Sequence, residues 1–348
     1  NISDQAVREG LAHTQWPARM EVLCRDPLFI LDGGHNPQCA QALRASLERL
    51  LPRRNVVFLT GVLADKDYGG ILREMFPLAQ EFVCLTPLSP RALPAGELAD
   101  FLTAQGVKAI PCATVAEGIR QALSAAGEDG VVVAFGSLYL AGAVRSAFPG
   151  VYRKWLRRDK IRARDALSPE ERERLSGELV TRLVSSPEFQ GAGTVLIYRA
   201  TRGEVRLEGL ETAPEAQGKR LAYPLCVSDT EMIALVPRGE NAWVDGYYGI
   251  REPDRDKSDL IAPEDIDLVV CPCTVFDQQC HRMGMGAGFY DRYLPQCVNA
   301  AVAAVAFECQ KAAQVPVSPW DRPMDMVLTE QRIYRADCPA EEKDEHCV

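Results

Sequence analysis

The sequence contains few histidines and no long hydrophobic run. Only 4 of its 348 residues are histidine, and they lie far apart, so a zinc site built from clustered His and Cys ligands is not expected. No apolar run approaches the roughly 18 residues that a membrane-spanning helix needs. The first residues are polar and lack the basic and apolar regions of a signal peptide. A fragment of a longer protein is one interpretation of a chain that begins without methionine.

Cysteine occurs 12 times, but no two cysteines have the Cys-x-x-Cys spacing. Scattered thiols are typical of a reducing compartment rather than of a disulfide framework, which favours the cytoplasm. The formal net charge is −9, so the whole molecule has no general attraction for nucleic acid or for an anionic membrane. We therefore expect a cytoplasmic protein with neither nucleic-acid nor membrane partners.

The first half of the chain alternates short apolar runs with segments of helical periodicity. A length of 348 residues exceeds one typical hydrophobic core, so two domains are expected. The alternation predicts a parallel sheet with helices on both faces, and Phe148-Pro149-Gly150 predicts a break after the last helix. The predicted strands are residues 28–31, 55–59, 82–85 and 131–135, and the predicted helices are residues 38–51, 69–79, 115–126 and 138–148.

A second α/β unit is predicted from about Val151. It opens with a basic stretch at residues 153–164, in which 7 lysines and arginines accompany a single acid. Ser168-Pro169-Glu170-Glu171 has the pattern of a capping box with proline at the first helical position, so a helix is expected from there to about Ser185. Strands are predicted at residues 194–198, 232–236, 267–271 and 301–307, and an acidic, disordered tail is predicted at residues 336–348.

The most informative stretch is residues 276–292, which read FDQQCHRMGMGAGFYDR. Three glycines at alternate positions remove every second side chain, so backbone N–H groups can converge on phosphate oxygens. Arg282 stands before them and could neutralise phosphate charge, and Asp291 stands after them and could bind Mg²⁺. A tight turn produces the same glycine spacing, so the spacing alone leaves both interpretations open. The glycines are Gly284, Gly286 and Gly288.

The pattern Phe-Asp-x-x-x-x-Arg-x-Gly-x-Gly-x-Gly-x-Tyr-Asp-Arg resembles the signature of the 5-formyltetrahydrofolate cyclo-ligase family. Further segments resemble the family in the same order over about 180 residues, nearly the whole second half. Cys280 stands where the family usually has Gly, Met285 and Ala287 occupy loop positions where other residues are frequent, and Trp320 stands where His often precedes an aspartate. The further segments are Arg153 with Arg157, Tyr198 with Glu204, residues 248–253, residues 307–310, and residues 315–330, which include Asp321.

This resemblance implies ATP- and Mg²⁺-dependent conversion of 5-formyltetrahydrofolate, with or without a polyglutamate tail, to 5,10-methenyltetrahydrofolate. Arg282 and Asp291 would be essential for catalysis, and His281 is interpreted as a loop residue rather than a base. By the same resemblance Asp291 and Asp321 would hold Mg²⁺. The implied ATP contacts are Arg153, Arg157, Arg282, Gly284, Gly286, Gly288 and Tyr290, and the implied folate contacts are Glu204, Tyr248 and Phe289.

The first half resembles the C-terminal domain of folylpolyglutamate synthase, a relative of the Mur ligases. The resemblance rests mainly on residues 16–21 and on residues 31–37, which read LDGGHNP. In that family Arg19 and Asp32 match ATP contacts and His35 lies beside them, although a strand–turn–helix connection capped by Asn36 would have the same sequence. A P-loop ending in Gly-Lys-Ser/Thr does not occur in this sequence, so we expect no glutamate ligation by this chain alone.

Both halves are therefore expected to be three-layer α/β domains. Residues 1–149 would form a Rossmann-like domain of the Mur ligase C-terminal type, and residues 150–335 a cyclo-ligase domain. Three functions stay open: an active cyclo-ligase with a non-catalytic first domain, a folate-binding module without turnover, and a truncated bifunctional ligase. The loop departures at Cys280, Met285 and Ala287 are the only features that favour the second.

Overall fold

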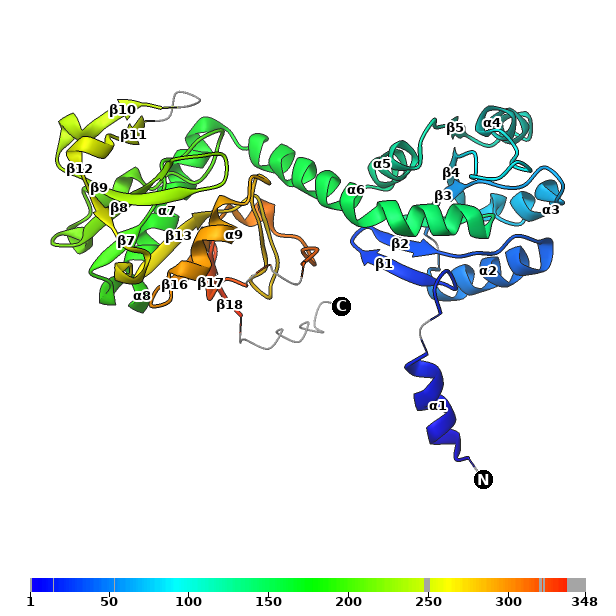
Figure 1. Cartoon of the computed structure of the whole chain (residues 1–348). Coiled ribbons are helices and arrows are strands. Elements are labelled where there is room, and N and C mark those ends of the chain that lie inside the picture. The colour runs from blue at the N-terminus through cyan, green and yellow to red at the C-terminus, as the bar shows by residue number, and fades with distance from the viewer. Residues whose placement is uncertain are drawn as a thin grey trace. The chain divides into compact units, whose positions relative to one another are not determined.

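The computed structural model describes residues 2–14, 16–52, 54–246, 251–318, 321 and 323–336 (Figure 1). Backbone contacts divide the chain into 2 compact units, Asn1–Trp155 and Leu156–Val348. The predicted acidic tail lies outside the described residues, apart from residue 336. No helix in the described part of the chain is both long and apolar enough to cross a membrane.

The first unit contains a 6-stranded sheet with the strand order β1-β2-β6-β3-β4-β5. All neighbouring strands are parallel except β1 and β2, which confirms the predicted parallel α/β fold. The strands are β1 Glu21–Arg25, β2 Leu28–Leu31, β3 Val56–Thr60, β4 Ala79–Cys84, β5 Ala109–Pro111 and β6 Val131–Phe135. The helices are α1 Asp4–Ala12, α2 Pro37–Leu50, α3 Tyr68–Arg73, η1 Phe76–Leu78, α4 Ala95–Ala104 and α5 Val115–Ala126.

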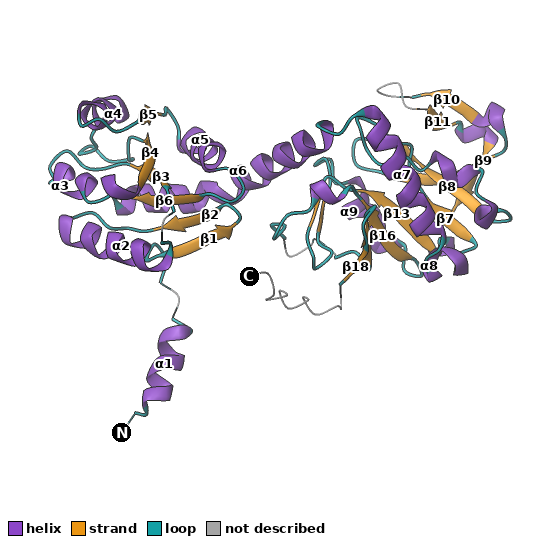
Figure 2. Ribbon diagram, turned by 180° about the vertical axis from the view of Figure 1, so that it is seen from behind, coloured by secondary structure: helices purple, strands orange, loops and turns teal. Residues whose placement is uncertain are grey.

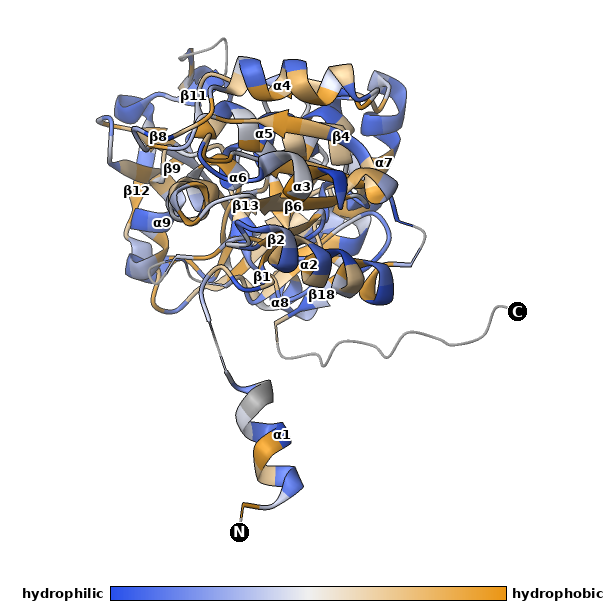
Figure 3. Ribbon diagram, turned by 90° about the vertical axis from the view of Figure 1, so that its right-hand side faces the viewer, coloured by the Kyte–Doolittle hydropathy of each residue, from blue (hydrophilic) through white to orange (hydrophobic). Residues whose placement is uncertain are grey.

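Burial and capping explain why these segments form. Every residue of β3 and β6 is buried, as expected of parallel strands covered on both faces. Asn36 caps α2 by accepting from the Cys39 backbone N–H, and Pro37 occupies the first helical position. Apolar residues dominate β4, whereas α4 carries hydrophilic residues on its outer turns (Figure 3). The sequence signals for core and caps therefore agree with the observed elements.

Helix α6, Leu138–Asp165, continues through Pro149, and the division between the two units falls within it, after Trp155 (Figure 1). The predicted break at residues 148–150 is therefore wrong. Proline removes one helical hydrogen bond, but packing on both sides of it holds the helix. Phe148 stacks on Tyr152 with centroids 5.3 Å apart, and the Tyr152 hydroxyl donates to the Asp26 carbonyl at 2.9 Å. Tertiary contacts thus override the local breaker signal.

The second unit contains an 8-stranded sheet with the strand order β12-β9-β8-β7-β13-β16-β17-β18 (Figure 2). Strands β8, β7, β13, β16 and β17 are parallel, and the outer strands are antiparallel. The strands of this sheet are β7 Thr194–Leu196, β8 Arg220–Cys226, β9 Met232–Pro237, β12 Ser258–Ile261, β13 Leu268–Pro272, β16 Ala301–Val305, β17 Met326–Leu328 and β18 Ile333–Arg335. Two short pairs accompany it, namely β10 Trp243–Asp245 with β11 Arg251–Pro253, and β14 Val275–Phe276 with β15 Arg282–Met283.

Helices cover both faces of this sheet. Val269 and Cys271 of β13 face one hydrophobic cluster with α9, Phe289–Tyr293, whereas Leu268 and Val270 face another with α7, Pro169–Val184. The predicted capping box of α7 is present, with Ser168 accepting from the Glu171 N–H. The remaining helices are short: α8 Pro187–Gly191, η2 Glu208–Glu211, η3 Pro214–Ala216, η4 Glu240–Ala242, η6 Arg255–Lys257, η7 Pro263–Asp265, η8 Leu294–Gln296 and η9 Glu308–Gln310.

The strand order reverses between β7 and β13. From β7 the chain proceeds to β8 on one side and later to β13, β16 and β17 on the other. In open parallel sheets, ligands bind beyond the carboxyl ends of the strands at such a reversal. The segments that follow β7 and β13 are therefore where a ligand site is expected.

Candidate functional site

The glycine loop, residues 284–288, connects β15 to α9. Gly286 has φ +109° and Gly288 has φ +74°, backbone conformations that side chains with a Cβ rarely adopt. A Cβ added at Gly288 would also lie 2.7 Å from the Arg292 Nη1. The Arg292 side chain is flexible and can move away, so glycine is favoured at Gly288 by its backbone conformation, and the loop exposes its backbone at the end of the sheet.

Two arginines fix the glycine loop by donating to its carbonyl groups. Arg157 of α6 donates from Nε to the Gly284 carbonyl at 2.8 Å, across 127 residues of sequence. Arg292 of α9 donates from Nη2 to the Ala287 carbonyl at 2.8 Å and from Nε to the Thr230 carbonyl at 2.7 Å. The structure thus brings Arg157 to the loop, while the predicted contact of Arg157 with ATP stays a prediction.

Arg282 is held at the carboxyl end of β13. Its side chain is only 4% exposed, and Nη1 donates to the Pro272 carbonyl at 2.9 Å. Nη2 pairs with the Asp291 carboxylate at 3.0 Å, and the guanidinium carbon lies 5.5 Å from the centre of the Tyr290 ring. Asp291 itself is half-exposed. A buried, oriented cation therefore stands at the base of the glycine loop beside an accessible carboxylate.

Glu204 lies in the segment that follows β7 and lines a small pocket with Arg172 and Arg206. Its Oε2 accepts from the Thr201 N–H at 3.0 Å. Burial raises the pKa of the Glu204 carboxyl above its ordinary value, although the guanidinium groups of Arg164 and Arg202 oppose this shift. Burial also raises the pKa of Tyr290 well above its usual range, and the Glu204 carboxylate adds to the effect. The charges of Glu204 and Arg282 therefore both act on Tyr290, and the Arg282 guanidinium lies over its ring.

The predicted metal ligands have separate contacts in the structure. Asp291 pairs with Arg282, and Asp321 accepts from the Ser318 N–H at 2.8 Å. No group of 3 or more His, Cys, Asp or Glu side chains among the described residues is arranged to hold a metal ion. Mg²⁺ bound to nucleotide phosphates needs only one or two protein carboxylates, so the half-exposed Asp291 fits that chemistry. The metal assignment stays a prediction.

The other predicted residues of this unit have varied surroundings. Phe289 lines a cavity of about 400 Å³ between the β8–β9 turn and α9, and Arg292 lies against its ring. His281 contacts the buried Asp277 through Nδ1 at 3.0 Å, in keeping with its interpretation as a loop residue. Arg153 lies on α6 one turn before Arg157. Tyr248 lies outside the described residues.

The predicted residues of the first unit surround Gly33, which follows β2. Asp32 accepts from the Gly34 N–H at 2.7 Å and from the Met20 N–H at 3.0 Å. His35 Nδ1 lies 3.0 Å from the Gly33 carbonyl, and the Arg19 Nη1 would lie 3.1 Å from a Cβ on Gly33. These contacts suffice to explain a strand–turn–helix connection, so ATP contact by Arg19, Asp32 and His35 stays a prediction.

One buried arginine in the second unit was missed by the sequence analysis. Arg164 is 1% exposed, and its Nη2 donates to the Arg202 carbonyl at 2.5 Å, in the turn before Glu204. In the sequence it is one of the 7 basic residues at 153–164. Arg157, Lys160 and Arg164 recur at the i, i+3 and i+7 spacing of one helical face, a signal that could have indicated burial.

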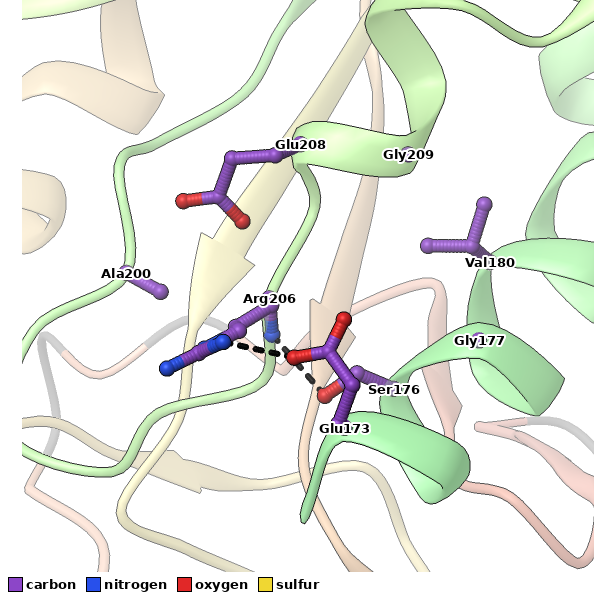
Figure 4. A pocket seen from close by; sticks show the side chains of 8 residues that line it. All are labelled: Glu173, Ser176, Gly177, Val180, Ala200, Arg206, Glu208 and Gly209. Atoms are coloured by element: carbon purple, nitrogen blue, oxygen red, sulfur yellow. Dashed lines mark hydrogen bonds and ion pairs between the residues drawn. The ribbon is translucent and has the colours of Figure 1, made fainter. Parts of the chain in front are cut away.

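A polar pocket of about 450 Å³ lies between α7 and η2 (Figure 4). Arg206 crosses it, pairing with Glu173 at 2.6 Å and donating its backbone N–H to the Ser176 hydroxyl at 3.1 Å. A smaller pocket of about 150 Å³ shares Ala200 and Arg206 with it and is lined by Glu204. The larger pocket contains none of the predicted site residues.

The two units of the chain match different known proteins. The model of the 5-formyltetrahydrofolate cyclo-ligase family matches residues 151–330, more than half of the chain. The chain belongs to this family. The cyclo-ligase of Escherichia coli K12 is 29% identical over 175 residues, which cover 49% of this chain and 96% of that protein. A solved 5,10-methenyltetrahydrofolate synthetase from Aquifex aeolicus is 32% identical, covering 56% of this chain and 97% of that one, with a TM-score of 0.48.

The first unit is similar to a different set of ligases. The model described as the Mur ligase, glutamate ligase domain matches residues 18–138. Folylpolyglutamate synthase from Lacticaseibacillus casei is 34% identical over 154 residues, which cover 43% of this chain but only 33% of that protein. The chain thus spans about a third of this relative. Both resemblances identified in the sequence are confirmed.

Proposed function

We propose that the second unit converts 5-formyltetrahydrofolate and ATP to 5,10-methenyltetrahydrofolate, ADP and phosphate. The proposal rests chiefly on one juxtaposition. Arg157 and Arg282 stand at the glycine loop with Tyr290 beneath the Arg282 guanidinium, and Glu204 follows β7, where the strand order reverses. A phosphate-binding surface next to a carboxylate suits a reaction in which a nucleotide and a folate must meet.

The chemistry requires activation of a poor leaving group. The formyl oxygen on N5 attacks the γ-phosphorus of ATP, the bond to ADP breaks, and an iminium phosphate forms. N10 then attacks the formyl carbon and loses its proton, and the carbon–oxygen bond breaks to release phosphate. Phosphoryl transfer of this kind depends on positioning and charge neutralisation more than on a strong base.

The described residues supply these needs. The glycine loop, held by Arg157, would bind the phosphates through its backbone N–H groups. Arg282 would neutralise the transferred phosphoryl group, because its guanidinium is oriented by the Pro272 carbonyl and the Asp291 carboxylate. Glu204 and Phe289 would orient the folate. Asp291 and Asp321 would hold Mg²⁺, which supplies further charge neutralisation when it is bound.

A turnover assay tests this proposal. The full chain is mixed with 5-formyltetrahydrofolate, ATP and Mg²⁺, and methenyl absorbance is followed together with ADP release. Equal amounts of methenyl product and ADP are expected, with neither in the absence of ATP. The alternative of a folate-binding module predicts that 5-formyltetrahydrofolate binds in equilibrium dialysis without any product, and that result would replace the proposal.

A further inference from the structure

The turn at residues 201–204 is strained and carries Glu204 at its end. Arg202 has φ +48° and Gly203 has φ +79°, so both central residues are left-handed. Glycine adopts this conformation freely, whereas arginine does so at a cost in conformational energy. The Glu204 N–H donates to the Thr201 carbonyl at 3.0 Å and closes the turn. Strained backbone persists only where its surroundings enforce it, and it occurs most often at functional sites.

Arg164 supplies part of that enforcement. Its Nη2 donates to the Arg202 carbonyl at 2.5 Å, and its Nε lies 3.6 Å from the Asp165 carboxylate. Its Nη1 is buried without a hydrogen-bond partner in the part of the chain that the structure describes. A buried guanidinium with incomplete hydrogen bonding is a poor source of stability. Its place in the core therefore favours a role in geometry or in the local electric field.

The turn also packs closely on arginine side chains. A Cβ added at Gly203 would lie 2.8 Å from the Arg172 Nη1 and 3.6 Å from the Arg164 Nε. Gly203 is thus confined between α6 and α7, and its neighbour Arg202 accepts the bond from Arg164. Arg164 therefore contacts the turn directly, at both of its central residues.

We propose that Arg164 is a positioning residue of the cyclo-ligase reaction, because its bond to the Arg202 carbonyl sets the turn that aims the Glu204 carboxylate at the folate. The inference rests on the proposed function. It assigns Arg164 no contact with the substrate, because its side chain is buried.

Arg164 also acts on the charge of Glu204. Arg172, Arg202 and Arg206 line the same pocket as this carboxylate, the Arg164 charge also acts on it, and its own charge acts on the phenols of Tyr198 and Tyr290. Burial raises the pKa of Glu204, and the Arg164 charge opposes the rise. Removing that charge raises the pKa further, so a higher pH is needed to ionise the carboxylate.

Arg164→Met removes the bond and the charge at similar volume, and Arg164→Lys keeps a cation. The matched control is Arg182→Met, because Arg182 also donates to backbone carbonyls, those of Thr329 at 3.0 Å and Glu330 at 2.7 Å. For Arg164→Met, the KM for 5-formyltetrahydrofolate is expected to rise about tenfold with kcat nearly unchanged. The acidic limb of the kcat/KM profile moves to higher pH, and Arg164→Lys returns it toward wild type. The proposal would be overturned if Arg164→Met left both the KM and the acidic limb of the pH profile unchanged. It would also be overturned if Arg182→Met changed them equally.

Hydrogen exchange separates this inference from the proposed function. Amides of residues 201–206 are expected to exchange faster in Arg164→Met than in wild type or Arg182→Met, with no need for turnover. If wild type makes no methenyl product, the proposed function fails, and the exchange result still decides whether Arg164 sets the turn. Unchanged exchange in Arg164→Met would show that it does not.

Discussion

Gln310 links the ends of two parallel strands beneath the site. It is 1% exposed, its amide nitrogen donates to the Cys273 and Thr274 carbonyls at 2.8 and 3.0 Å, and its amide oxygen accepts from the Phe307 N–H at 3.0 Å. Gln310→Leu keeps the volume but leaves three backbone groups without partners. At about 1 kcal/mol for each bond, the second unit should lose about 3 kcal/mol of unfolding free energy.

Hydrogen exchange measures this loss for the second unit alone, which a global melt of two units would not. Amides of β13 and β16 that open only on unfolding should exchange about a hundredfold faster in Gln310→Leu, since every 1.4 kcal/mol is a factor of ten. The exposed Gln217→Leu is the control and should change exchange little. If Gln310→Leu exchanges as wild type does, these three bonds do not stabilise the strand ends.

Three further changes address the loop and the carboxylate. Gly288→Ala, at φ +74°, should raise the KM for ATP about tenfold, whereas Gly177→Ala, in open space on α7, should not. Arg157→Met removes the 2.8 Å bond to the loop and should also raise the KM for ATP about tenfold, while the exposed Arg158→Met leaves it unchanged. Burial raises the pKa of Glu204, so the folded state binds the Glu204 proton more tightly than the unfolded state does. The folded state therefore loses stability as the pH rises from the pKa of unfolded Glu204 through the pKa of folded Glu204. Glu204→Gln should therefore be more stable than wild type at pH 7 and equal to it near pH 3.

Each of these three predictions would be contradicted by a specific result. An unchanged KM for ATP in Gly288→Ala would mean that the loop does not approach the nucleotide. An equal effect of Arg157→Met and Arg158→Met would point to general charge rather than to the bond at Gly284. A Glu204→Gln variant less stable than wild type at pH 7 would show that the carboxylate is favourably paired in the folded state.

The bounds of a helix or strand were predicted correctly where a local sequence signal marks its ends. Strands β2 and β6 and helix α5 have the predicted bounds, because a continuous apolar run or a side-chain cap delimits each one. The predicted helix at residues 69–79 is wrong beyond Arg73, where a 3-10 turn containing Pro77 leads into β4 at Ala79. Helix α4 was missed, since its first residue follows Pro94 without a side-chain cap. Strand β8 was missed because it is only half-buried and contains Pro224.

The features of the candidate site also divide into those that a local sequence pattern indicates and those that it does not. Arg282, the glycine loop and Asp291 lie within ten residues, so a local motif could indicate all of them. The contacts of Arg157 with Gly284 and of Arg164 with Arg202 join distant segments, and no local pattern specifies such a partner. The resemblance to the family named Arg157 and Gly284 as ATP contacts, whereas both contacts between side chain and backbone are found only in the structure.

The role of Arg282 is tested most directly by methenyl formation in wild type, Arg282→Met and Arg174→Met. Arg174 is an exposed arginine of α7 that pairs with Glu178, and it serves as the control. Loss of the oriented cation should lower kcat by about a hundredfold or more, as removal of a single transition-state donor does elsewhere, while β13 exchange stays protected. Arg174→Met should keep wild-type kcat. Near wild-type methenyl formation by a folded Arg282→Met would contradict the assignment of the cyclo-ligase reaction to this site.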